Sequence, residues 1–219
     1  RAIQSVLGQT YADFELLVVE NGTPAGAKKI VEEFRTHDRR VRYLYHSKPN
    51  GSVARNTGIK ASSGRYVAFL DDDDEWLPTK LERQVEVLDV HPEIGVVTCR
   101  AHVIDSAGRV IDEQPYYTGE LTLKALISKG CVVWSASSLL MRRECFDRVG
   151  FFNPRLSMAQ DCDLTIRVAR SYKLLCAQQV LFKYHYHGDN LSRNTIQAWR
   201  AHIRMLRAVA LAPELGVNK

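Results

Sequence analysis

The sequence lacks any run of about 18 apolar residues, the length that a membrane-spanning helix needs. It opens on Arg1-Ala2-Ile3 without the apolar stretch of a secretion signal. Its Lys and Arg residues are not gathered into a block of the kind that follows a nucleic-acid backbone. From these absences we expect a soluble, cytoplasmic protein that does not bind nucleic acid.

Closely spaced cysteine pairs are also absent. The five cysteines lie far apart, and none forms the C-x-x-C pair of a zinc knuckle or a thioredoxin-like motif. Their odd number and apolar neighbours predict buried thiols in a reducing compartment. The formal net charge of +5 favours an anionic ligand, such as a nucleoside diphosphate or an anionic membrane surface.

The 219 residues, 45% of them hydrophobic, are enough for one large α/β domain with a core. Strand-like apolar runs alternate with helical patterns through the first half of the chain. This alternation predicts a parallel sheet covered by helices. The expected strands are 14–19, 41–45, 66–70 and 95–99, and the expected helices are 27–34, 52–61 and one beginning at Pro78.

The second half of the chain is less regular. Helices are expected at 121–129, 142–149, 161–171 and 195–212, and strands at 137–141 and 180–184. The chain starts on a helical pattern at 2–7, with no strand before it. We therefore expect the first strand of the sheet to be missing. Either the sequence is a fragment of a longer protein or the domain is degenerate, and the retained carboxylates favour a fragment.

An acidic cluster, Asp71-Asp72-Asp73-Asp74-Glu75, directly follows the strand-like run 66–70. An acidic run can be a solvated loop. However, ligands of open α/β sheets bind at the carboxyl ends of strands, and clustered carboxylates repel one another unless a cation lies among them. Mg²⁺ and Mn²⁺ prefer oxygen ligands and often bind carboxylates together with substrate phosphates. The position of the cluster therefore favours a metal–diphosphate site.

The segment around this cluster, Phe69-Leu70-Asp71-Asp72-Asp73-Asp74-Glu75-Trp76-Leu77-Pro78, resembles the "fLDsDDiwlp" motif of family 2 glycosyltransferases. Further segments resemble motifs of the same family in the same order, at 5–16, 50–58, 91–95, and 149–161. Several motifs in order are more specific than any one. The resemblance implies the GT-A fold, a Rossmann-like three-layer α/β/α domain with a mainly parallel central sheet.

The resemblance also implies an activity, the transfer of a sugar from a nucleoside-diphosphate sugar to an acceptor hydroxyl, with metal dependence and inversion. It divides the chain into a nucleotide-sugar-binding half (1–100), an acceptor-binding and catalytic half (101–192) and a C-terminal helix (193–219). A UDP-sugar is the expected donor, and the expected acceptor is a saccharide or a lipid-linked sugar. Two alternatives stay open, a metal-dependent nucleotidyltransferase and a non-catalytic nucleotide- or sugar-binding domain.

Residue roles follow from the matched motifs. The resemblance assigns Asp73 to the metal, Mn²⁺ or Mg²⁺, and places His187 near it. It places Asp71 and Asp72 beside the ribose and the diphosphate. It further assigns four residues to the nucleotide: Glu20, Asn21, Arg55 and Asn56. The pair Glu20-Asn21 stands where the family usually has Asp-Asp, so the base preference is open.

The catalytic base implied by the resemblance is Asp161, which would take the proton of the acceptor hydroxyl. From the sequence alone, the role that Asp161 fits better is the N-cap of the helix after it, and the resemblance reverses this preference. Asp163 is a substitute candidate that should face elsewhere. Gln160 replaces a Glu that is more frequent in the family, and both Gln160 and Trp134 fall where the acceptor is expected.

The last helix, 195–212, carries apolar residues on one face and arginines on another. Basic amphipathic helices can lie on anionic membranes, which would place the protein at the inner face of the membrane. The alternative is a helix that packs on its own domain with its arginines in water.

Overall fold

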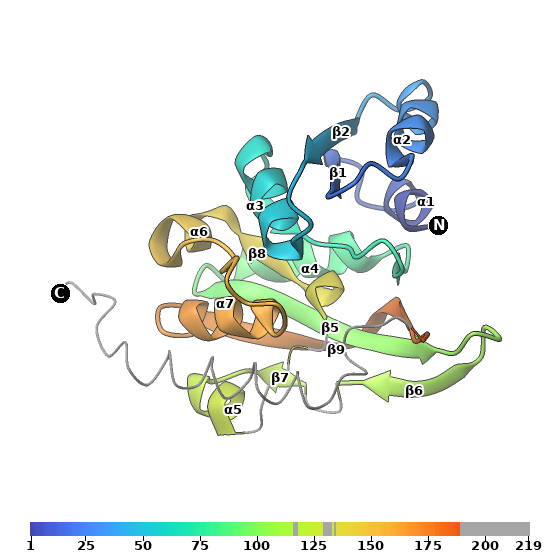
Figure 1. Cartoon of the computed structure of the whole chain (residues 1–219). Coiled ribbons are helices and arrows are strands. Elements are labelled where there is room, and N and C mark those ends of the chain that lie inside the picture. Colours follow the sequence, from blue (N-terminus) through green and yellow to red (C-terminus); the bar gives the residue numbers. More distant parts are fainter. Residues whose placement is uncertain (116–117, 129–132, 134, 189–219) are drawn as a thin grey trace.

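The structure, a computed structural model, describes residues 1–115, 118–128, 133 and 135–188. Among the helices in these ranges, none is long and apolar enough to cross a bilayer. The described chain folds into helices packed around two sheets, one small and one large (Figure 1).

The small sheet holds two parallel strands, β1 (Leu16–Asn21) and β2 (Val41–His46). Helices α2 (Ala27–Arg35) and α3 (Gly51–Ala61) pack against it, whereas α1 (Ala2–Leu7) packs against β4 (Glu75–Trp76) of the large sheet. Helix α3 begins at a side-chain cap, because Asn50 Oδ1 accepts a hydrogen bond from Val53 N at 3.1 Å.

The large sheet has the strand order β3-β8-β5-β9-β4, with β6 paired to β5 and β7 paired to β9. Its longest members are β5 (Ile94–Ile104) and β9 (Lys173–His185), which run parallel. The shorter strands are β3 (Tyr66–Ala68), β4 (Glu75–Trp76), β6 (Val110–Gln114), β7 (Gly119–Glu120) and β8 (Leu140–Arg142).

The expected mainly parallel sheet is mixed instead. Among the described strands, the β1–β2 and β5–β9 pairings are parallel, whereas β3–β8, β5–β8, β4–β9, β5–β6 and β7–β9 are antiparallel. The strand β8 lies between β3 and β5 and runs against both of them, so these two strands share a direction without touching. The alternation of the first half therefore agrees with the shared direction of β1 and β2 and with that of β3 and β5, but it does not predict that β8 lies between β3 and β5.

The core lies on both faces of the large sheet. Alternate residues of β5 point to opposite faces, as the period of a strand requires. Val96 packs in a cluster with Leu164 of α7 (Gln160–Val168), while Val97 packs in another with Leu88 of α4 (Lys80–Val90). Helices α5 (Leu123–Ser128) and α6 (Arg143–Val149) pack against α7. The domain thus has the three layers expected.

Most expected elements are present with shifted ends. The sequence missed β4, β6 and β7, which are short or rich in polar residues. The expected strand at 137–141 is divided into a 3-10 turn (Ala136–Ser138) and β8. The expectation of buried thiols holds for Cys99, Cys145 and Cys176, but Cys162 is disulfide-bonded, a spatial pairing that sequence spacing does not reveal.

Candidate functional site

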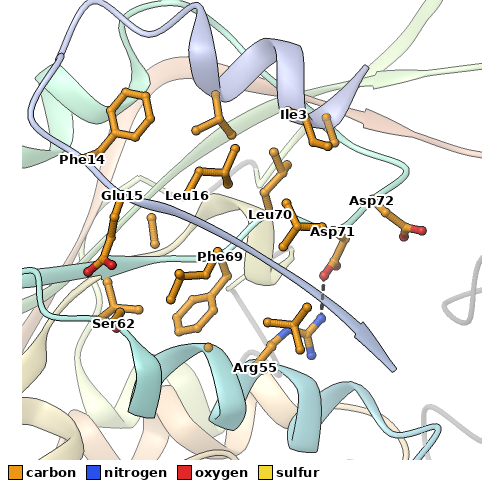
Figure 2. Close-up of a pocket in the computed structure, with 18 of the residues that line it drawn as sticks. Ile3, Phe14, Glu15, Leu16, Arg55, Ser62, Phe69, Leu70, Asp71 and Asp72 are labelled. Carbon is orange, nitrogen blue, oxygen red and sulfur yellow. Dashed lines mark hydrogen bonds and ion pairs between the residues drawn. The ribbon is translucent and has the colours of Figure 1, made fainter. Parts of the chain in front are cut away.

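An open cleft of about 1340 Å³ separates the two sheets. Its walls include every residue of β1 on one side and the segment 64–73, with β3, on the other. Within the described residues, β1 is hydrogen-bonded only to β2 and β3 only to β8, so each presents an unpaired strand edge. Figure 2 shows apolar side chains such as Leu16, Phe69 and Leu70 between these walls, with Asp71 and Asp72 at one end.

The acidic cluster forms a tight turn at the end of β3. Asp74 N donates to Asp71 O at 3.1 Å, so Asp72 and Asp73 occupy the turn's two central positions. The turn is anchored to the 3-10 turn Ala136–Ser138, because Asp71 N donates a hydrogen bond to Ser137 Oγ at 3.0 Å. The side chain of Asp72 is exposed, whereas that of Asp74 is fully buried. Asp71, Asp72 and Asp73 therefore line the cleft, whereas the side chain of Asp74 points into the protein.

Asp74 is a buried support of this turn that sequence reasoning missed. Its carboxylate accepts a hydrogen bond from His185 N at 3.3 Å and one from Ser135 Oγ at 3.5 Å. Burial, with a smaller contribution from the charges of Asp71 and Asp73, raises the pKa of Asp74 to about 7, although hydrogen bonds from Ser137 and His185 N lower it. Nothing in a run of four aspartates distinguishes the one that the fold buries.

Asp73 lies beside His187, with Asp73 Oδ2 and His187 Nε2 3.0 Å apart. A carboxylate oxygen and an imidazole nitrogen are both common metal-ligating groups. In the described part of the chain, no three His, Cys, Asp or Glu side chains converge on one point. The pair therefore fits a cation whose remaining ligands come from a diphosphate and water, which is how Mg²⁺ is usually bound.

Arg55 links the acidic turn to helix α7. Its Nη2 donates to Asp71 Oδ1 at 2.6 Å, an ion pair that Figure 2 shows as a dashed line. Its Nη1 donates to Gln160 Oε1 at 2.8 Å, and the guanidinium lies 5.5 Å from the ring centre of Phe152. Two residues far apart in sequence, Asp71 and Gln160, are thus held by one side chain.

Asp161 follows Gln160 in the first turn of α7. The N-cap of this helix is Ala159, so Asp161 does not have the capping role that its sequence position suggested. Its carboxylate accepts a hydrogen bond from Cys162 N at 2.9 Å. Burial raises the pKa of Asp161, while the nearby Arg55 guanidinium lowers it. Asp163 faces elsewhere, as expected, and pairs with Arg167 at 2.8 Å.

The other residues assigned to the nucleotide make contacts within the protein. Glu20 accepts hydrogen bonds from Tyr43 Oη at 2.5 Å and Ala25 N at 2.6 Å, and the Tyr43 bond lowers its pKa. Both ends of the Asn56 amide bond to the backbone of Phe152. Asn21 and Glu20 both line the cleft.

Trp134 and the C-terminal helix (193–219) lie outside the described residues, so their predicted roles stay predictions.

The known proteins that are similar in sequence to this chain are glycosyltransferases. The model of the family described as "Glycosyl transferase family 2" matches residues 1–150. An uncharacterized glycosyltransferase of Nostoc sp. is 29% identical over 197 residues, which cover 87% of this chain and 61% of the relative. The uncharacterized glycosyltransferase EpsJ of Bacillus subtilis is 28% identical over 206 residues, covering 87% of this chain and 58% of the relative. The chain thus spans less than two thirds of these relatives.

Solved structures show the same fold. TarS of S. aureus, residues 1–349 in complex with UDP, has a TM-score of 0.72 at 18% identity, covering 98% of this chain and 62% of that one. The mannosyltransferase PcManGT of Pyrobaculum calidifontis, in complex with GDP-Man and Mn²⁺, has a TM-score of 0.69 at 17% identity, covering 97% and 59%. The fold is therefore of the GT-A type, and the chain belongs to glycosyl transferase family 2.

Proposed function

We propose that this chain transfers a sugar from a nucleoside-diphosphate donor, a UDP-sugar, to a hydroxyl of a saccharide or lipid-linked acceptor, with inversion at the sugar carbon. The observation that carries the proposal is the joining of two sites by Arg55. Asp71, at the turn that lines the cleft, and Gln160, next to the half-buried Asp161, bind the same guanidinium. A donor in the cleft and an acceptor near Asp161 would then meet at this junction.

The donor side of the proposed site is the cleft with Asp71, Asp72, Arg55 and Asn21 on its walls. The GT-A structures similar to this chain include one in complex with UDP and one with GDP-Man. Both ligands are nucleoside diphosphates or their sugar esters, which supports a donor of this class. Residues 1–100 would hold it, while residues 101–192 supply the acceptor side.

Asp73 and His187 would hold the divalent cation, Mn²⁺ or Mg²⁺. When bound, such a cation stabilises the negative charge that develops on a departing diphosphate. Hydrogen bonds within the chain position these two side chains. The bonds of Asp71 N and Asp74 hold the acidic turn, and the turn in its place holds Asp73 beside His187.

Asp161 would act as the base that takes the proton of the acceptor hydroxyl. Its raised pKa makes the carboxylate a stronger proton acceptor than an exposed aspartate, and Arg55 keeps a positive charge near it. A hydroxyl deprotonated in this way attacks the sugar carbon from the face opposite the leaving diphosphate, so one displacement inverts that carbon.

The donor site is tested by calorimetric titration of UDP, GDP and dTDP, each with Mn²⁺ and with EDTA. We expect UDP to bind in the presence of Mn²⁺ and to bind at least about tenfold more weakly in EDTA, which is about 1.4 kcal/mol. Asp73→Ala should cause a similar loss, because it removes the proposed cation ligand. Asp147→Ala, an exposed aspartate on α6, is the matched control. Equal affinity with and without metal would contradict the cation site.

The base is tested by Asp161→Asn, which keeps the shape of the side chain and removes its basicity. We expect turnover to fall by about 10²–10⁴-fold, the usual contribution of a general base, with nucleotide affinity unchanged. The measurement is the release of nucleoside diphosphate from the donor that the titration identifies. Near-normal turnover in this variant would exclude Asp161 as the base.

A further inference from the structure

Gln160 is held at both ends of its side-chain amide. Its Oε1 accepts from Arg55 Nη1 at 2.8 Å, and its Nε2 donates to Leu156 O at 2.9 Å. The amide group can donate and accept at once, which a carboxylate cannot do. A glutamate at this position could keep the contact with Arg55 but would place a carboxylate oxygen against the Leu156 carbonyl.

These two bonds fix the start of α7. The residue before Gln160, Ala159, has a left-handed backbone with φ 56° and ψ 31°, a conformation that is unfavourable for an alanine. Surrounding contacts must hold such a residue in place. The Gln160 bonds do so directly beside it, and they thereby set where Asp161 stands relative to Arg55.

The charges around Asp161 are nearly balanced. Arg55 carries one positive charge and forms an ion pair with Asp71. Gln160 is neutral, so its hydrogen bond to Arg55 does not offset the guanidinium charge. Asp163 on the same helix is paired with Arg167. The elements that pack against α7 also carry Lys124 on α5, Arg143, Glu144, Asp147 and Arg148 on α6, and Arg100 and His102 on β5. The charges that act most on the Asp161 carboxyl are those of Arg55 and Asp71.

We infer that Gln160 is a positioning residue: its neutral amide holds Arg55 between the acidic turn and α7, so that the guanidinium charge stays available to Asp161. This inference rests on the proposed function only in giving Asp161 a catalytic use. A carboxylate at position 160 would draw the guanidinium to itself and add a like charge one residue from Asp161. Both effects favour the protonated form of Asp161.

The test is the titration of the Asp161 carboxyl by NMR in protein labelled with ¹³C at aspartate carboxyl carbons, with the signal assigned by its loss in Asp161→Asn. We expect Gln160→Glu to move the titration midpoint of Asp161 to higher pH. Gln179→Glu, which adds the same charge at an exposed position of β9, should leave the midpoint in place. The pH profile of turnover should move in parallel, its acidic limb shifting upward in Gln160→Glu alone.

An unchanged Asp161 midpoint in folded Gln160→Glu would overturn the inference. If that variant does not fold, Arg55→Gln provides the second measurement, because it removes the cation and leaves the carboxylates. The midpoint should again rise, and an unchanged one overturns the inference. The NMR readout does not depend on catalysis. A normal turnover in Asp161→Asn would therefore remove the proposed base while the titrations still decide the role of Gln160.

Discussion

The strands β1 and β5 have similarly apolar sequences but different surroundings. In β1 every residue is half-buried, whereas in β5 all residues except Arg100 and His102 are buried. The strand β5 has β9 on one edge and β8 and β6 on the other, while β1 pairs with β2 alone in the part of the chain that the structure describes. An apolar run predicts a strand, but its burial depends on neighbours at both edges and helices on both faces.

This difference has a functional side. The uncovered edge of β1 is one wall of the cleft, and the acidic turn after β3 lies at the other wall. The 3-10 turn before β8 anchors the acidic turn through Ser137, and the end of β9 anchors it through His185, so the acidic turn is held on the large-sheet side of the cleft.

The largest expected effect compares one leucine from each region. Leu88→Ala, in the fully buried contact between α4 and β5, should lower the free energy of unfolding by about 2–5 kcal/mol through the cavity it leaves. Leu17→Ala on β1 should lower it by about 1 kcal/mol or less, because that side chain is already half-exposed. Urea unfolding at constant m-value measures both. Equal losses would mean that the β1–β2 sheet is as tightly packed as the large sheet.

The next effect concerns Lys80, a fully buried lysine of the large sheet's core. Its Nζ donates to Gln84 Oε1 at 2.7 Å and lies 4.2 Å from the Trp76 ring centre. Burial lowers the pKa of Lys80 to about 8. Between pH 8 and about 10.5 the unfolded chain binds more protons at this site than the folded one, so the free energy of unfolding rises with pH across this window.

Lys80→Met should remove that rise and raise the free energy of unfolding by about 1–3 kcal/mol below pH 8, where the buried charge is most unfavourable. The exposed Lys29→Met on α2 is the control and should change neither value. Unfolding curves at pH 7, 9 and 10.5 provide the comparison. A slope that persists in Lys80→Met would assign the pH dependence to another group.

The smallest effect is local. Backbone amides of β1 should exchange with deuterium at least about tenfold faster than those of β5, because β1 lies at an unpaired edge and opens without the rest of the sheet. Mass spectrometry of peptides covering 14–22 and 94–104 measures this difference. An extended apolar segment added before Arg1 that pairs with β1 should slow its exchange, which would show that the cleft accepts a strand. Equal rates in the unmodified chain would contradict the comparison.

Much of the fold is predictable from the sequence because local patterns carry it. The apolar runs and helical spacings predict β1, β2, α2, α3, α4 and α7 with small shifts at their ends. The short strands β4, β6 and β7 have too few alternating apolar residues to stand out. Their pairing with β9 and β5 forms them, and this pairing is a tertiary contact.

For the site, the sequence by itself determined the family, through several motifs in order, and the presence of carboxylates at the end of a strand. Only the tertiary structure decided which aspartate of the four is buried, that Arg55 joins Asp71 to Gln160, and that Asp161 stands inside the helix and not at its cap. The physical reason is the distance along the chain. Local patterns set the backbone over a few residues, whereas Arg55 reaches Asp71 across 16 residues and Gln160 across 105, and Asp74 reaches His185 across 111. Such contacts form only when the sheet and its helices pack.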